Sequence, residues 1–239
     1  MRFQAEVIAS TLNTFYEGAS LGRIKRHIQL EYGVQPDHAS IHRWIMRYTK
    51  VAVAGIGQPA LVSGDEWVAL SSTIFTYFAR GQTTRNLDVV DLSSGFLLGT
   101  HMDFGPSAGD EAGVIAAAAR TALRWPTTVL TNSLEFLPLE RGWNSPVYPM
   151  SGFDPSCIEI ETPPKNVTRV RGWLRDRAST LAGLGSTRTA ALVLKGWMVH
   201  YNYFRPHPGF GGRTPAAVAS VRGRFESWAH VVGNSTVRN

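Results

Sequence analysis

The segment Thr127-Thr-Val-Leu-Thr-Asn-Ser133 decides the predicted fold class. Its β-branched and apolar residues follow Trp125-Pro126, which ends the preceding pattern, and they predict a short buried strand over 127–131. The chain before this strand has the patterns of three further strands and of an alanine-rich helix, at 67–78, 86–92, 95–103 and 107–124. Turn residues separate those three strands, which favours antiparallel pairing. This order of elements predicts an α/β fold, with a mixed sheet flanked by helices.

The chain after this strand is predicted to be irregular and then helical. Residues 137–156 are rich in Pro and Gly, which interrupt regular elements. Three helical patterns follow, and they lie at 166–181, at 187–203 and from Thr214-Pro215 to about Ala229. We therefore expect one α/β domain over 65–232, followed by a frayed tail at 233–239.

The first fifty residues have a separate pattern of three short helices. These helices are expected at 3–17, from Ser20 to about Leu30, and from Asp37 or Ser40 to Tyr48. Gly33 gives a short turn between the second and the third. A helix, a short glycine turn and a further helix are typical of a helix-turn-helix. We therefore expect a helix-turn-helix domain at 1–50 and a linker at 51–64.

The composition favours an intracellular globular protein with a polyanionic partner. Of the 239 residues, 44% are hydrophobic and 18% are charged, which excludes a disordered chain. No apolar run is long enough to span a bilayer and the first residues form no secretory signal, so we expect a cytoplasmic location. The net charge of +6 favours nucleic acid as the partner. A basic protein without such a partner is the alternative.

Four stretches of the chain share their order and spacing with one known family. They are Leu21–Val34 with Ser40–Tyr48, Asp65-Glu66, Arg169–Leu181, and His200–His207 with Gly211–Ala216. In this order they resemble the helix-turn-helix, the first catalytic strand, the third catalytic helix and the C-terminal signature of the DDE insertion-sequence transposases. That family belongs to the ribonuclease-H-like superfamily, which also holds the retroviral integrases. The resemblance implies a ribonuclease-H-like domain that cuts and joins DNA with Mg²⁺ and acts as a homo-oligomer.

The resemblance places the three catalytic positions at Asp65, Asn132 and Thr168. Asn132 and Thr168 are 36 residues apart, which is similar to the family's spacing between its second and third acids. Only Asp65 has a carboxylate, whereas a pair of divalent cations needs several. We therefore expect Mg²⁺ binding through Asp65 to be weak or lost, and strand cutting to be absent or feeble. Two alternatives stay open: a DNA-binding regulator derived from a transposase, and an active Mg²⁺-dependent nuclease that uses Glu135 as a displaced acid.

Basic and polar residues of the expected helix-turn-helix are the candidate contacts to double-stranded DNA. In such a motif the N-terminal residues of the third helix meet base edges, which makes Ser40, His42 and Arg43 the candidate base readers. The other candidate DNA-contacting residues are Arg23, Lys25, Arg26, Arg47, Lys50, Arg171 and Arg175. The last two share one helix face near the expected active site. The alternative for each group is a solvated basic helix without a ligand.

Overall fold

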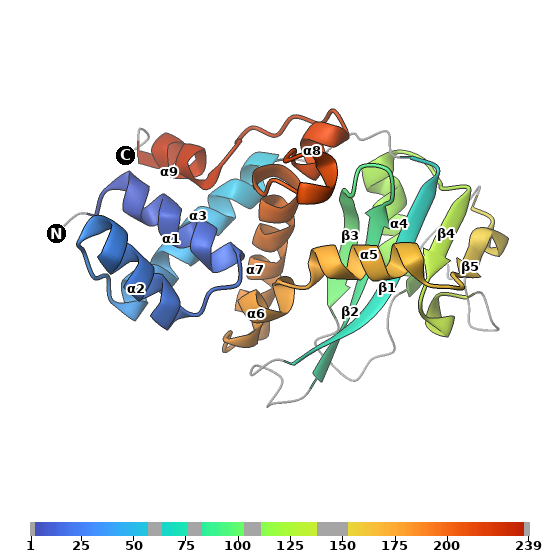
Figure 1. The fold of residues 1–239 in the computed structure, drawn as a ribbon, viewed down its shortest axis with the longest axis horizontal. Coiled ribbons are helices and arrows are strands. Elements are labelled where there is room, and N and C mark those ends of the chain that lie inside the picture. Colours follow the sequence, from blue (N-terminus) through green and yellow to red (C-terminus); the bar gives the residue numbers. More distant parts are fainter. Residues whose placement is uncertain (1–2, 57–63, 76–82, 103–110, 138–152, 237–239) are drawn as a thin grey trace.

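The chain folds into a helical lobe and a lobe built on one β-sheet (Figure 1). The computed structural model describes residues 3–56, 64–75, 83–102, 111–137 and 153–236. The helices are α1 (Ala5–Tyr16), α2 (Leu21–Tyr32), α3 (His38–Ile56), α4 (Glu111–Ala122), α5 (Lys165–Leu174), α6 (Arg177–Ala182), α7 (Thr187–Val199), α8 (Pro215–Val218) and α9 (Trp228–Thr236). The strands are β1 (Glu66–Phe75), β2 (Thr83–Asp91), β3 (Leu97–Met102), β4 (Thr128–Thr131) and β5 (Ile158–Ile160).

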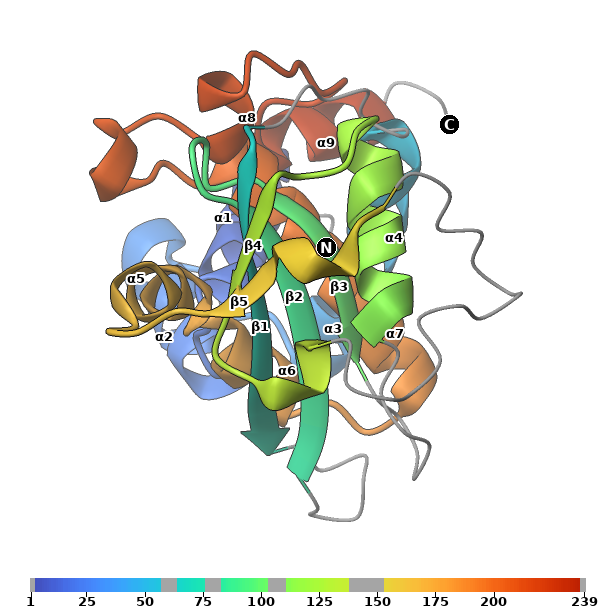
Figure 2. The same cartoon turned by 90° about the vertical axis from the view of Figure 1, so that its right-hand side faces the viewer.

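The sheet has the strand order β3-β2-β1-β4-β5. β1 pairs antiparallel with β2, and β2 pairs antiparallel with β3, whereas β1, β4 and β5 run parallel to one another. Figure 2 shows the sheet between α5 on one side and α4 on the other. The prediction of an α/β fold with a mixed sheet flanked by helices is confirmed.

Alternating side chains of β1 divide the buried residues into two clusters. Val68, Leu70 and Ile74 belong to the larger cluster, which continues through α5, α6 and α7 into α1, α2, α3 and α9. Trp67 and Ala69 point to the opposite face and pack with α4. The helical lobe therefore shares one core with one face of the sheet. No helix among the described residues has both the length and the apolar character needed to cross a bilayer.

The helical lobe includes helices from the C-terminal part of the chain. α7 packs against α3, and α9 packs against α1 and α3. Gly196 of α7 lies so close to Tyr16 and Thr49 that a Cβ atom at this position would be 2.2 Å from the Tyr16 hydroxyl. Tyr16 and Thr49 join α1 to α3 through a buried hydrogen bond of 2.6 Å between their hydroxyl groups. The three predicted N-terminal helices are present, but their core is completed by distant segments.

The predicted linker at 51–64 is wrong for residues 51–56, because α3 continues to Ile56. Ala52 is fully buried in the core that α3 shares with α7 and α9, so packing extends the helix beyond the predicted end. Residues 57–63 lie outside the described part of the chain. The third helix begins at His38, where the Asp37 carboxylate accepts a hydrogen bond of 2.6 Å from the Ser40 N–H.

Three predicted helices in the second half of the chain also have different bounds. The predicted helix at 166–181 is two helices, α5 and α6, with a break at 175–176. The helix predicted over 187–203 ends as α7 at Val199, and a π-helical turn, His200–Phe204, follows. The predicted helix from Pro215 to Ala229 is the short α8, a non-helical stretch and then α9, which extends through most of the predicted tail. Ser220, with a φ of +59°, lies after α8 and is incompatible with a continuing helix.

Candidate functional site

Asp65, the one carboxylate expected in the catalytic site, lies immediately before β1. Its carbonyl oxygen accepts hydrogen bonds from the N–H groups of Thr127 (2.9 Å) and Thr128 (3.2 Å), at the start of β4. Its carboxylate forms an exposed ion pair with Arg124. Because β1 and β4 run parallel, Asn132 lies beyond the other end of β4, five residues or roughly 16 Å away. The prediction that Asp65 and Asn132 share one catalytic site is therefore wrong.

Asn132 extends the pairing between β4 and β1 by one residue. Its Oδ1 accepts a hydrogen bond from the Ser71 N–H (3.2 Å), and its Nδ2 donates to the Ser71 carbonyl oxygen (3.2 Å). The side-chain amide therefore satisfies both backbone groups of Ser71, as a paired strand residue would. A carboxylate cannot do the same, because it has no N–H to donate. Asn132 consequently has a structural role that an ionised aspartate would not fill.

We expect Asn132→Asp to lower the free energy of unfolding by about 1 to 3 kcal/mol at pH 7, because the Ser71 carbonyl would lose its donor and face a negative charge. The loss should become smaller at pH 4, where protonation lets the new carboxyl group donate a hydrogen bond. Urea unfolding at both pH values measures this difference. Asn13→Asp, at an exposed position of α1, is the control, and equal losses in the two variants would contradict the structural role of Asn132.

Leu70 is the β1 residue that lies beside Asn132, because the register pairs Ala69 with Thr131. Its side chain is 2% exposed and belongs to the core on the α5 side of the sheet. The sequence analysis looked for an acidic residue near the beginning of β1 and chose Asp65, so it missed Leu70, which has no carboxylate. The register of the parallel strands places the end of β4 beside Leu70, the fifth residue of β1, and the sequence does not give that register.

The start of α5 is tied to the end of β4 through Glu161. The Glu161 N–H donates to the Thr131 carbonyl oxygen (3.2 Å). The Glu161 carboxylate accepts hydrogen bonds from the N–H groups of Asn166 (2.9 Å) and Val167 (2.8 Å), in the first turn of α5. The adjacent Thr168 is exposed. Thr168 and Asn132 therefore lie at the same end of β4, far from Asp65, and Glu161 is engaged as a helix cap.

The residues at this meeting point of β1, β4 and α5 do not fit a magnesium site. Leu70 has no ligand atom, both polar side-chain atoms of Asn132 bond to Ser71, and Thr168 offers only a neutral hydroxyl. Mg²⁺ sites use carboxylates together with water or phosphate oxygens in an octahedral arrangement. Among the residues that the structure describes, no three His, Cys, Asp or Glu side chains form a group that could hold a metal ion.

Glu135, the candidate displaced acid, lies on the opposite face of the sheet. Its carboxylate pairs with Arg85 (2.7 Å) and accepts hydrogen bonds from the hydroxyls of Ser71 (3.3 Å) and Ser133 (3.1 Å). The Ser71 side chain points away from the α5 face, because it alternates with Leu70 along β1. Glu135 is thus engaged on the α4 side, and its position does not favour the alternative of a rescued nuclease.

The comparison with known proteins adds no relative. No protein-family model matches the chain, and no curated protein does. The resemblance to the transposases therefore depends on the sequence motifs alone.

The predicted base-reading helix α3 has an exposed basic strip. His42, Arg43, Arg47 and Lys50 are all exposed, and the last three recur at spacings of four and three residues, which places them on one helix face. Ser40 is the exception, because it is 8% exposed and its hydroxyl accepts a hydrogen bond of 3.0 Å from Arg43. Ser40 therefore orients Arg43, and its prediction as a direct base reader is corrected.

The remaining candidate DNA contacts form two groups. On α2, Arg23 and Arg26 are exposed, and Lys25 is half-buried. Arg171 on α5 and Arg175 just after it are exposed, but α5 lies against the sheet rather than in the helical lobe (Figure 1). The structure therefore separates the basic residues of α2 and α3 from those of α5, so that a DNA ligand would meet them as two distinct contacts.

A buried cluster holds the helical lobe to the C-terminal part of the chain. The Trp228 Nε1–H donates to His200 Nδ1 (3.2 Å), so the other ring nitrogen, Nε2, carries the proton and donates to Glu17 (3.1 Å). Burial lowers the pKa of His200, and the hydrogen bond from His200 lowers the pKa of Glu17. Tyr16 stacks on Trp228, with 4.8 Å between ring centroids. This cluster joins α1, the π-helical turn and α9 into one packed unit.

Proposed function

We propose that the protein binds double-stranded DNA, is of the DDE transposase type, and has lost the strand-cutting chemistry. The strand order β3-β2-β1-β4-β5, with β2 alone antiparallel to its two neighbours, is compatible with a ribonuclease-H-like core. The proposed loss of strand cutting is supported above all by one observation. At the meeting point of β1, β4 and α5, the residues Leu70, Asn132 and Thr168 supply no carboxylate. A two-metal phosphoryl-transfer site needs several converging acids there.

The arrangement of α2 and α3 supports the DNA-binding part of this proposal. α2 ends at Tyr32, and the φ of +67° at the next residue, Gly33, lets the chain turn before α3 begins at His38. The first turns of α3 present His42 and Arg43, with Arg47 and Lys50 further along the same helix. In our proposal the start of α3 enters the major groove, where Arg43 meets a base and the later basic residues meet phosphates.

The decisive experiment selects bound duplexes from a random pool and measures their affinity by fluorescence anisotropy. We expect Arg43→Ala to weaken binding to the selected duplex by about 1 to 3 kcal/mol, because an arginine that reads a guanine edge contributes on that scale. Binding to unrelated duplexes should change less. The control is Arg188→Ala, at an exposed position on α7, which removes the same charge and should leave the preference unchanged.

The same selected duplex also tests the loss of chemistry. Incubation with Mg²⁺ or Mn²⁺ should give neither nicked nor joined strands. If metal-dependent joining is observed, the proposed loss of chemistry is wrong. If the wild type binds every duplex equally and Arg43→Ala has no effect, the helix-turn-helix assignment is wrong. Our proposal also has the protein acting as a homo-oligomer, as the transposases do, and sedimentation with and without the duplex tests that.

A further inference from the structure

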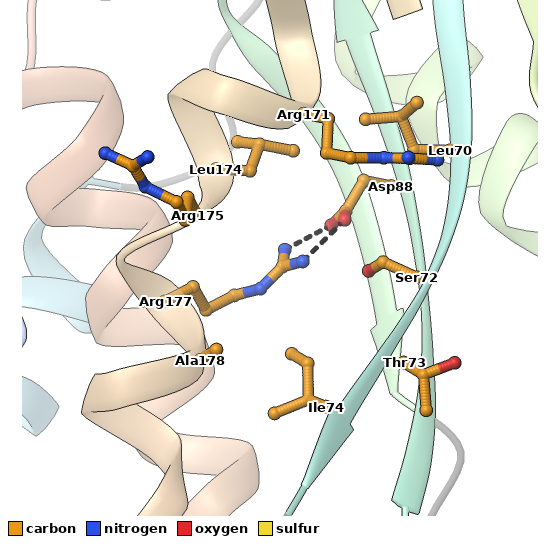
Figure 3. A pocket seen from close by; sticks show the side chains of 10 residues that line it. All are labelled: Leu70, Ser72, Thr73, Ile74, Asp88, Arg171, Leu174, Arg175, Arg177 and Ala178. Atoms are coloured by element: carbon orange, nitrogen blue, oxygen red, sulfur yellow. Dashed lines mark hydrogen bonds and ion pairs between the residues drawn. The ribbon is translucent and has the colours of Figure 1, made fainter. Parts of the chain in front are cut away.

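A hollow of about 200 Å³ lies between β1 and the two helices α5 and α6, on the Leu70 face of the sheet (Figure 3). Its floor is the buried ion pair between Asp88 of β2 and Arg177 of α6, with nitrogen–oxygen distances of 2.5 and 2.8 Å. Arg171 extends from α5 across its upper side to Leu70, and the Ser72 hydroxyl points into the space between the strand and Arg177 (Figure 3).

The hydrogen-bonding groups around this hollow are mainly donors. Arg171 is exposed, and no acid within the described part of the chain pairs with it. Arg177 is 3% exposed and uses both terminal nitrogens on Asp88, while its Nε–H has no hydrogen-bond partner among the described residues. A buried donor without a partner is unusual and costs free energy unless a ligand or water satisfies it. Arg175 also lines the hollow but points away from the strand in Figure 3, and Arg171 and Arg177 against the one carboxylate of Asp88 leave a net positive charge.

We propose that this hollow binds a phosphate group of the DNA backbone. Arg171 supplies the positive charge that the two metal ions supply in a two-metal site. This inference rests on the proposed function. The Arg171 guanidinium lies over Leu70, beside which Asn132 ends β4, and it supplies a permanent positive charge without carboxylate ligands. The Arg177 Nε–H is a second donor for the phosphate oxygens. The Ser72 hydroxyl donates to the Asn86 carbonyl oxygen (3.4 Å), and on binding it turns from that carbonyl to the phosphate. The phosphate is held and no bond is broken, because none of the described residues that line the hollow activates a nucleophile.

The first experiment titrates the full chain with inorganic phosphate and follows the Arg177 Nε–H resonance by NMR spectroscopy. We expect this resonance to move in the wild type, and to move at least about tenfold less at the same phosphate concentration in Arg171→Gln. Arg120→Gln removes a charge from an exposed site on α4, across the sheet, and should behave as the wild type. If phosphate leaves the resonance unmoved in the wild type, the proposal is wrong.

The second experiment measures affinity for the selected duplex at several salt concentrations in EDTA. Loss of one phosphate contact should reduce the slope of log affinity against log salt by about one in Arg171→Gln, but not in Arg120→Gln. Ser72→Asp, which adds a negative charge inside the hollow, should weaken binding at least about tenfold. Subsequent addition of Mg²⁺ at constant ionic strength should not strengthen binding. An unchanged slope in Arg171→Gln overturns the proposal.

The two experiments separate failure of this inference from failure of the proposed function. If Arg43→Ala weakens DNA binding while Arg171→Gln changes neither the salt slope nor the phosphate titration, the DNA-binding proposal stands and the hollow is not a phosphate site. If phosphate moves the Arg177 resonance but no duplex is bound, the hollow takes a small free phosphate, and both the backbone assignment and the proposed function are overturned.

Discussion

Arg177→Met is expected to lower the free energy of unfolding by about 3 to 5 kcal/mol, because it leaves a buried carboxylate without its charged partner. Arg177 and Asp88 are 3% and 1% exposed, and the guanidinium donates to both carboxylate oxygens. Methionine fills much of the same space, but it leaves Asp88 with the Thr100 hydroxyl as its main remaining donor. Urea unfolding at pH 7 measures the loss.

Two further variants show whether this loss comes from an unpaired buried charge. Arg124→Met breaks the exposed ion pair with Asp65 and should cost less than about 1 kcal/mol. The double variant Asp88→Leu with Arg177→Met should recover much of the stability, because it removes both charges. If Arg177→Met costs no more than Arg124→Met, the buried pair does not have the structural role assigned to it.

The second large effect is expected at Asn202. This residue is 3% exposed, its Oδ1 accepts from the Leu97 N–H (2.9 Å), and its Nδ2 donates to the Leu97 carbonyl oxygen (3.0 Å). Asn202→Asp should destabilise the protein by about 3 kcal/mol at pH 7, because it buries a carboxylate against that carbonyl. The pKa of the new carboxyl group should be raised, so the destabilisation should shrink as the pH falls.

A matched substitution at Asn166 controls for the chemistry of the change. Asn166 lies in the first turn of α5 and accepts a hydrogen bond from Arg169, which a carboxylate also accepts. Asn166→Asp adds negative charge at a helix N-terminus, where it is favourable, and should leave stability unchanged or slightly raised. Thermal unfolding at pH 7 and pH 4 compares the two variants. Similar losses in both would contradict the role assigned to the Asn202 amide.

Periodicity predicted the regular elements well where local pattern and packing agree. β1 to β4 and α4 lie where the alternating and helical patterns indicate, and α3 begins at His38, next to one of its two predicted starts. β5 was missed because it has only three residues, just after the stretch rich in Pro and Gly, and three residues carry too little periodicity. The break between α5 and α6 was missed because Arg177 turns toward Asp88, which is 89 residues earlier in the sequence. Such contacts override local propensity.

The candidate site was predicted only in part, because spacing along a sequence does not give the register of parallel strands. Asn132 and Thr168, which the sequence placed in one site, do lie at the same end of β4. The choice of Asp65 was wrong, since the pairing of Ala69 with Thr131 is visible only in the fold. The use of both Asn132 amide groups on Ser71 is likewise visible only in three dimensions.

The packing of α9 on α1 has a consequence for how the molecule is made. Trp228 stacks on Tyr16, so residues more than two hundred positions apart share one contact. During synthesis the first helices emerge from the ribosome long before their partner does. The proposed DNA-contacting surface of α2 and α3 should therefore reach its folded form only after α9, which ends at Thr236, has left the ribosome. A polypeptide that stops before α9 should not compete with the chain that includes α9 for a binding sequence.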